Sequence, residues 1–292
     1  AKPLIDKLET QAKKYFFSAL EKYNIVISQG FIGATEEGVT TTIGRGGSDY
    51  SAALFGSALG SEMIQIWTDV DGMMSADPRI VSESKLINTL SFNEASELAY
   101  FGAKVLHPNT ILPAVQKNIP VRILNSRRPE VEGTLILQAP ETEHKSIVKS
   151  IASKKGIIVI NIASSRMFLA HGFLSKLFSI FAEHQKSVDV VSTSEVSVSL
   201  TIDNDKDLEQ IRKDLENIGE IRIEHKKGIV CIVGEGMKKT PGIAARAFTA
   251  LANTNINIEM ISEGASEINL TLVVEEEDVD KAVRVLHDEF FK

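Results

Sequence analysis

An internal repeat in the second half of the chain constrains the fold more than any other feature. Each copy reads as strand, helix, strand, hairpin, strand and helix, which predicts two similar α+β modules. In the first copy we expect strands at 157–162, 188–191 and 196–202, and helices at 173–184 and 206–217. The matching residues are Gly172, Phe178, Ala182, Ser192, Ser194, Glu195 and Leu200 in the first copy, and Gly242, Phe248, Ala252, Ser262, Ser266, Glu267 and Leu272 in the second, which has two residues inserted before Ser266.

The first half of the chain has a different pattern. A β-rich run at 24–28 is followed by a glycine-bounded loop, a helix-forming run at 50–59 and a strand pattern at 63–67. This order predicts an α/β sheet with ligand loops at the carboxyl ends of its strands. Further expected elements are helices at 2–23, 91–100 and 110–117, a hairpin or flap at 35–43, strands at 121–125 and 133–137, and a polar linker at 139–145.

Composition excludes several classes of function. The 292 residues suffice for about two domains, and 43% of them are hydrophobic. A net charge of −7 and a pI near 5.5 argue against a general nucleic-acid or acidic-membrane surface, because both need clustered positive charge. No apolar run reaches the roughly 20 residues of a membrane helix, so we expect a cytoplasmic protein with no membrane or nucleic-acid partner. The single cysteine, Cys231, is expected to be a buried strand thiol.

Residues 44–54 combine a glycine-rich loop with the start of a helix. Adjacent glycines permit a tight turn and close approach to a ligand, and the first turn of a helix offers free N–H groups to an anion. Arg45 adds a planar fork for a carboxylate or phosphate, and Asp49 adds an acid that can organise a metal or a lysine. The alternative is a glycine-rich turn with an exposed arginine.

Four motifs in order, at 44–49, 67–79, 101–108 and 193–197, resemble those of the aspartate kinases. The resemblance covers essentially the whole chain. It implies an α/β amino-acid-kinase-type sheet with flanking helices, N-terminally truncated, followed by two ferredoxin-like α+β ACT modules. The implied boundaries are 1–138 for the kinase portion, 146–227 for the first ACT module and 228–292 for the second. The first module's opening strand follows 149–155, a segment that pairs with the second module in this family, so we expect interleaved modules.

The same resemblance implies roles for individual residues of the kinase portion. Arg45 would hold a carboxylate of L-aspartate, helped by Ser48 and the Gly47 N–H group, and Phe31 would line the site. Asp49 would be the catalytic carboxylate that orders the charged groups around the transferred phosphoryl. The nucleotide-binding residues would be Thr68, Asp69, Met74, Arg79 and Lys104, with Thr68 and Asp69 beside the nucleotide and Arg79 and Lys104 at the ATP phosphates.

The implied reaction uses ATP and Mg²⁺. A β-carboxylate is already ionised at neutral pH, since its unperturbed pKa is about 3.9, so its phosphorylation needs no strong general base. It needs charge neutralisation, in-line positioning and a metal that bridges phosphate oxygens. The six histidines are scattered without ligand spacing, so we expect no metal held by the protein alone.

The ACT resemblance implies an effector site in the first module and a homodimer through these modules. Asp189 is expected to bind an effector ammonium, and the helix start near Gly172 its carboxylate. Lysine is the expected effector, although Ala170 stands where a serine is common in the family. A purely structural dimerisation pair is the alternative. The implied effector-binding residues are Met167, Gly172, Phe173, Leu174, Val188, Asp189, Ser194 and Glu195.

The sequence also departs from the family. The N-terminal strand with its Lys-Phe-Gly-Gly-Thr motif and the acidic residue for the substrate amine are missing, and the chain opens at Ala1 without a methionine. We therefore expect this polypeptide by itself to be weakly active or inactive. Another amino-acid kinase acting on glutamate or acetylglutamate, and a noncatalytic amino-acid-binding regulatory subunit, are the alternative functions. A fused homoserine dehydrogenase beyond either end stays open.

Overall fold

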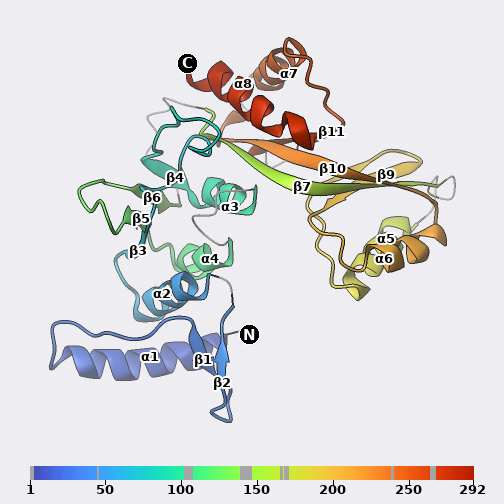
Figure 1. Ribbon diagram of the computed structural model, residues 1–292. Coiled ribbons are helices and arrows are strands. Elements are labelled where there is room, and N and C mark those ends of the chain that lie inside the picture. The colour runs from blue at the N-terminus through green and yellow to red at the C-terminus, as the bar shows by residue number, and fades with distance from the viewer. Residues whose placement is uncertain are drawn as a thin grey trace. The chain divides into compact units, whose positions relative to one another are not determined.

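The computed structural model describes residues 3–44, 46–101, 108–138, 147–164, 167, 171–237, 240–263 and 268–292. The chain divides into two compact units (Figure 1). The first unit comprises residues 1–78 and 83–149, and the second comprises residues 79–82 and 150–292. The expected linker at 139–145 lies outside the described residues.

The first unit contains a four-stranded sheet in the order β3-β5-β6-β4. Strand β3 runs parallel to β5, and β4 runs parallel to β6, while β5 and β6 are antiparallel. A separate antiparallel hairpin, β1 with β2, lies at the expected flap. The elements are α1 (Ile5–Leu20), β1 (Ile32–Ala34), β2 (Thr40–Thr42), α2 (Gly47–Leu59), β3 (Ile64–Thr68), β4 (Thr89–Ser91), α3 (Phe92–Phe101), α4 (Pro108–Lys117), β5 (Val121–Asn125) and β6 (Thr134–Leu137).

Helix α3 begins with the predicted capping box. The Ser91 N–H donates to Glu94 Oε2 at 2.9 Å, and the Glu94 N–H donates to Ser91 Oγ at 3.1 Å. These two bonds satisfy backbone donors that a helix start leaves open. The helix therefore starts where the sequence placed it.

The predicted strand at 24–28 is wrong. These residues form no strand, and Ile25 and Ile27 are 76% and 92% exposed. A strand needs a neighbour for its backbone hydrogen bonds, and in the described part of the chain no sheet edge pairs with this segment. β propensity alone therefore did not produce a strand here.

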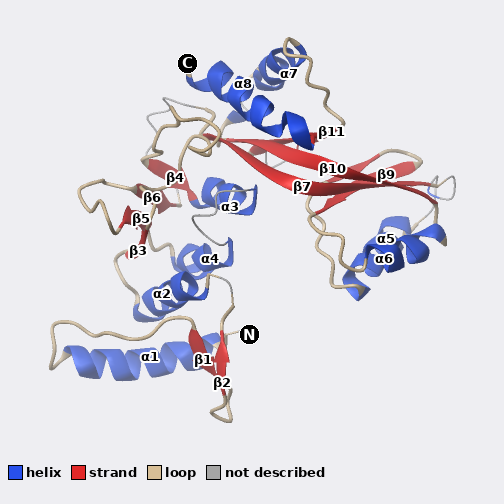
Figure 2. Cartoon of the chain, in the orientation of Figure 1, coloured by secondary structure: helices blue, strands red, loops and turns tan. Residues whose placement is uncertain are grey.

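The second unit is built on one six-stranded sheet in the order β11-β12-β10-β7-β9-β8. Two long strands cross its centre, and Figure 2 shows one helix pair on each side of them. The elements are β7 (Ser150–Ala163), α5 (Phe173–Glu183), β8 (Val191–Thr193), β9 (Ser197–Ile202), α6 (Leu208–Glu216), β10 (Glu220–Val233), α7 (Ile243–Ala252), β11 (Met260–Glu263), β12 (Asn269–Glu275), the 3₁₀ helix η3 (Glu276–Asp278) and α8 (Val279–Phe291).

The long strands are shared between two ferredoxin-like halves. The first module uses 157–163 of β7 and 220–224 of β10, and the second module uses 228–233 of β10. Residues 150–155 of β7 pair with 228–233, which supplies the second module with a strand that precedes the first module in sequence. This pairing is the interleaving that we expected.

Each module begins its first helix at a glycine in the left-handed region. Gly172 caps α5 with φ 82°, and Gly242 caps α7 with φ 91°. A left-handed backbone favours glycine, which explains why this residue recurs in both copies. Cys231 is fully buried on β10, as predicted.

Candidate active site and effector site

The first turn of α2 forms the centre of the candidate active site. Gly44 and Gly46 have φ values of 99° and 67°, so the loop enters the helix through two left-handed residues. No described side chain caps this helix start. The Gly47 N–H donates to the Gly44 carbonyl at 3.0 Å, so an anion would meet the following N–H groups of the first turn and the positive end of the helix dipole. Arg45, the expected carboxylate ligand, lies outside the described residues.

Phe31 is held against this helix start. Its N–H donates to Ser51 Oγ at 2.9 Å, and Ser51 Oγ donates to the Gly47 carbonyl at 2.7 Å. A Cβ on Gly47 would lie 2.8 Å from Phe31 Cδ2, so only glycine leaves room for the ring. The structure thus brings Phe31 and Gly47 together. The sequence analysis missed Ser51, although its position one helical turn after Gly47 was a usable signal.

Asp49 and Ser48 occupy the same turn of α2. Ser48 is exposed, and its Cα would lie 3.2 Å from a Cβ on Gly30, so the Gly30 loop lies close against it. Asp49 is half-buried, and burial raises the pKa of its carboxyl. An acid in this position is close to the open N–H groups at the start of the helix.

Thr68 and Asp69 follow the end of β3. The Ser126 N–H and Oγ both donate to the Thr68 carbonyl, at 2.8 and 2.9 Å, which ties this end to the end of the parallel strand β5. Thr68 Oγ1 donates to Asp69 Oδ1 at 3.3 Å, and Asp69 is exposed. These residues therefore form part of the carboxyl edge of the sheet, as a nucleotide site there requires.

Helix α2 runs back along the sheet before β3. A short turn joins α2 to β3, and a Cβ on Gly56 would overlap the Ile64 side chain, so helix and strand pack tightly. A helix joined to the next strand by a short turn runs antiparallel to it. The amino end of α2, with Asp49, thus lies toward the same edge as Thr68.

The segment after β3 is anchored through Thr134. Thr134 Oγ1 accepts the Met73 N–H at 2.8 Å and donates to the Ile87 carbonyl at 2.7 Å. Met74, the next residue, forms a single antiparallel bridge with Leu86. These contacts fix the backbone of the expected nucleotide segment. Arg79 groups with the second unit, and Lys104 lies outside the described residues, so their phosphate-binding roles stay predictions.

The candidate effector residues lie before, within and after α5 in the first module. Met167, Phe173 and Val188 pack against the buried core of this module. Gly172 caps the helix, and Leu174 is 39% exposed beside it. The structure therefore places this set in one module. Ser194 and Glu195 are exposed in the turn between β8 and β9.

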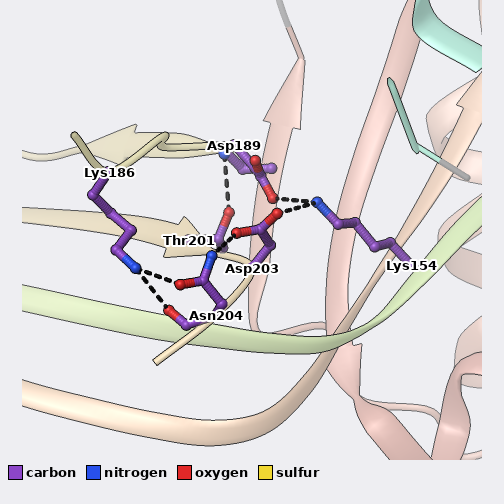
Figure 3. Close-up of polar contacts among 7 residues, drawn as sticks. Lys154, Lys186, Asp189, Thr201, Asp203 and Asn204 are labelled. Carbon is purple, nitrogen blue, oxygen red and sulfur yellow. Dashed lines mark hydrogen bonds and ion pairs between the residues drawn. The ribbon is translucent and has the colours of Figure 1, made fainter. Parts of the chain in front are cut away.

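Asp189 is the buried charge of this set. Its N–H donates to the Thr201 carbonyl at 3.0 Å, which fixes its backbone beside β9. Its side chain is 3% exposed, and Lys154 Nζ lies 3.0 Å from its Oδ2 (Figure 3). The sequence analysis missed Lys154. The recurrence of Lys-Lys-Gly at 154–156 and 226–228 was the available signal.

No cluster of three or more potential ligating side chains for a metal ion occurs among the described residues. Single carboxylates remain, notably Asp49 and Asp69. Each is a single carboxylate of the kind that Mg²⁺ uses in proteins when phosphate oxygens supply its other ligands. Within the same part of the chain, no helix is long and apolar enough to cross a membrane.

Comparison with known proteins finds a family model in each half of the chain. The amino acid kinase family model matches residues 5–125, and an ACT domain model matches residues 230–290. The crystal structure of the aspartate kinase of Clostridium acetobutylicum is 35% identical with a TM-score of 0.86, covering 97% of this chain and 67% of that one. The chain belongs to the aspartate kinase family.

Other aspartokinases add detail. Lysine-sensitive aspartokinase 3 of Escherichia coli is 41% identical over 92% of this chain and 61% of its own length. The crystal structure of E. coli aspartokinase III with aspartate and ADP in the R-state has a TM-score of 0.88 at 39% identity, and the T-state with lysine and aspartate has a TM-score of 0.82 at 39%. Both cover 100% of this chain and 66% of theirs. The chain spans about half the length of the curated plant aspartokinases that it matches.

Proposed function

We propose that this chain serves an aspartate kinase, which transfers the γ-phosphoryl group of ATP to the β-carboxylate of L-aspartate and yields 4-phospho-L-aspartate and ADP. One observation carries the proposal. The uncapped start of α2, with Phe31 packed on Gly47 and Asp49 in the first turn, lies toward the edge of the sheet at which Thr68 and Asp69 end β3. The likeness to aspartokinase III with aspartate and ADP supports it.

On the acceptor side, the chain's residues bind and orient aspartate. Arg45, Ser48 and the N–H groups that follow Gly47 in the first turn of α2 hold a substrate carboxylate, and Phe31, packed on Gly47, closes one side of the site. An ionised β-carboxylate oxygen then attacks the γ-phosphorus while the bond to ADP breaks. Asp49 stands at the reaction centre, where it orders the positive groups around the phosphoryl.

On the nucleotide side, Thr68, Asp69 and Met74 lie along the base and ribose, and Arg79 and Lys104 neutralise phosphate charge. A thioether packs well against a flat base, so Met74 suits that place. Mg²⁺, when bound with ATP, would be held on the protein side by Asp49 or Asp69 and would supply positive charge against the phosphates. The protein contributes positioning and charge, which is most of what phosphoryl transfer requires.

We also propose feedback inhibition by lysine at the first module. Asp189 takes an effector ammonium, and the start of α5 at Gly172 takes its carboxylate. Ser194 and Glu195 are exposed on the adjoining turn, and Leu174 adds exposed apolar surface for a second copy of the module. The resulting homodimer would couple lysine binding to the kinase unit by shifting a conformational equilibrium. The lysine complex of aspartokinase III supports this assignment.

The test combines an activity and a binding measurement. Hydroxylamine trapping of the acyl phosphate by the gene product that carries this chain should depend on ATP and L-aspartate. In Gly47→Ala the new methyl group meets Phe31, so we expect at least about tenfold weaker aspartate binding by calorimetry. Gly33→Ala is the matched control, because its Cβ makes only an ordinary 3.6 Å contact with Thr41. Trapping without aspartate dependence, or unchanged binding by Gly47→Ala, would overturn the proposal.

A further inference from the structure

The carboxylate that we assign to the effector already holds an ammonium group of the protein. Lys154 Nζ lies 3.0 Å from Asp189 Oδ2, and the Lys154 side chain is 27% exposed. Lys154 lies on β7, at a distance in sequence from the effector residues. An effector lysine carries the same chemical group as this side chain. The two ammonium groups therefore compete for one buried carboxylate.

Lys154 also has a second carboxylate within reach. Its Nζ lies 3.4 Å from Asp203 Oδ2, and the Asp203 side chain is 40% exposed (Figure 3). The neighbouring Asn204 accepts from Lys186 Nζ at 2.5 Å and donates to Asp203 Oδ1 at 2.7 Å, which holds Asp203 in place. Lys154 can thus leave Asp189 for solvent-facing Asp203 and keep an acidic partner.

The second module contains a similar but tighter cluster around Lys227, which is the second lysine of the repeated Lys-Lys-Gly whereas Lys154 is the first. Lys227 Nζ contacts Glu259 at 2.6 Å and Glu275 at 2.7 Å, where the first module has Asp189 and Asp203. A third carboxylate, Glu224, lies 3.2 Å away, and the Lys227 side chain is only 5% exposed. Three carboxylates hold the Lys227 ammonium group. Lys154 has two carboxylate partners and is more exposed, so it is better able to move.

We propose that Lys154 is an internal competitor that sets the effector sensitivity of the first module. The inference rests on the proposed role of Asp189. Binding requires Lys154 to move from Asp189 to Asp203, so the apparent affinity equals the intrinsic affinity multiplied by the fraction of molecules in which Asp189 is open. A tethered ammonium has a high effective concentration, which keeps that fraction small.

Replacement of Lys154 by methionine tests the competition. Methionine keeps an apolar stem but has no ammonium, so Asp189 is buried without this partner and gains more from an incoming cation. We expect Lys154→Met to bind L-lysine about tenfold more tightly than wild type in calorimetric titrations of the whole chain. Lysine should also raise the melting temperature of this variant more than that of wild type.

Two further variants control for charge and for folding. Lys154→Arg keeps a cation on Asp189 and should show no gain in lysine affinity. Lys155→Met makes the same change at the next residue, whose Nζ instead pairs with Asp280 at 2.8 Å, and should bind lysine as wild type does. A gain confined to Lys154→Met supports competition.

Other outcomes overturn the inference in distinguishable ways. If wild type binds lysine and Lys154→Met binds it equally or more weakly, the competitor role is wrong and the effector site stands. If neither protein binds lysine, both the inference and the proposed effector are wrong. If Asp189→Asn retains wild-type affinity, the effector ammonium lies elsewhere and Lys154 does not compete with it.

Discussion

At the scale of single residues, Asp49, the proposed catalytic carboxylate, lowers the stability of the unliganded fold at neutral pH. It sits half-buried in the first turn of α2, and burial raises the pKa of its carboxyl. A buried carboxylate is disfavoured unless a positive group or hydrogen bonds compensate. Active sites often tolerate such groups because the substrate or cofactor supplies the compensation.

Asp49→Asn should therefore stabilise the unliganded chain at neutral pH while it lowers kinase turnover by about 100-fold or more. The folded pKa is raised, so the contribution of Asp49 to stability is greatest below the ordinary aspartate pKa of about 3.9 and falls as pH rises through the folded pKa. The gain from asparagine should be roughly a few tenths of a kcal/mol, because solvent screens a half-buried group.

Thermal unfolding of both proteins at neutral pH and near pH 3.5 measures this difference. The advantage of Asp49→Asn should be present at neutral pH and absent in acid, where the wild-type carboxyl is itself protonated. A stability difference that does not change with pH would contradict the assigned cause.

At the scale of elements, Thr134 joins strand β6 to the segment that follows β3. One hydroxyl accepts the Met73 N–H and donates to the Ile87 carbonyl, and the residue is fully buried. Valine has the same shape but no hydroxyl. Both backbone groups would lose this partner in the interior, which is costly.

Thr134→Val should lower the free energy of unfolding by about 1–3 kcal/mol, measured by urea denaturation. It should also weaken nucleotide binding, because Met74 directly follows the released Met73 N–H. Thr42→Val, on the exposed position of β2, is the matched control and should change neither quantity. Unchanged stability of Thr134→Val would show that the hydroxyl does not anchor the segment.

At the scale of the whole molecule, Lys227 lies where the long strand β10 passes from the first module to the second. The pairing of β10 with β7 changes register at this residue. Residues 220–224 of β10 pair with the end of β7, and residues 227–233 pair with β12 and with the first part of β7. Burial alone would lower the pKa of Lys227, but its hydrogen bonds with Glu259, Glu275 and Glu224 outweigh burial and raise it. The charged network is therefore satisfied inside the second unit.

Lys227→Met should destabilise the second unit by about 1–3 kcal/mol, because the three partner carboxylates lose their shared cation but stay partly exposed to solvent. Chemical denaturation followed by circular dichroism measures the loss. Lys226→Met is the control, since Lys226 is exposed at the adjacent position and should tolerate the change. A loss of similar size in both variants would point to the strand rather than to the ion pairs.

The ion pairs of Lys227 make the stability lost in Lys227→Met depend on pH. The hydrogen bond to Lys227 lowers the pKa of Glu275, so its contribution exists above the ordinary glutamate pKa of about 4.3 and is lost as pH falls. The raised pKa of Lys227 gives a contribution that is complete below about 10.4 and is lost at higher pH. The penalty of Lys227→Met should be largest between these limits and shrink in acid.

Local sequence determined the features that depend on backbone chemistry and periodicity. The recurring glycines before α5 and α7 marked the starts of these helices, since the left-handed backbone at Gly172 and Gly242 favours glycine, whereas α2 begins at Gly47, before the expected run at 50–59. The capping box predicted the start of α3, and the repeat predicted two similar modules, while their interleaving was implied by the family resemblance. Motif order predicted the family. Each of these signals is contained within a short segment or a regular spacing, so it can be read without knowing the fold.

Only the tertiary structure decided the features that depend on what lies across a sheet. The run at 24–28 has β propensity but no neighbouring strand, so it stays irregular and exposed. Lys154 lies on β7, whereas Asp189 lies before β8 and is bonded through its N–H to Thr201 on β9, so the pair depends on how β7 and β9 come together in the sheet. The sequence thus identified Asp189 as a candidate anchor for a ligand ammonium. In the folded chain, the pairing of β7 with β9 brings the ammonium group of Lys154 to the same carboxylate.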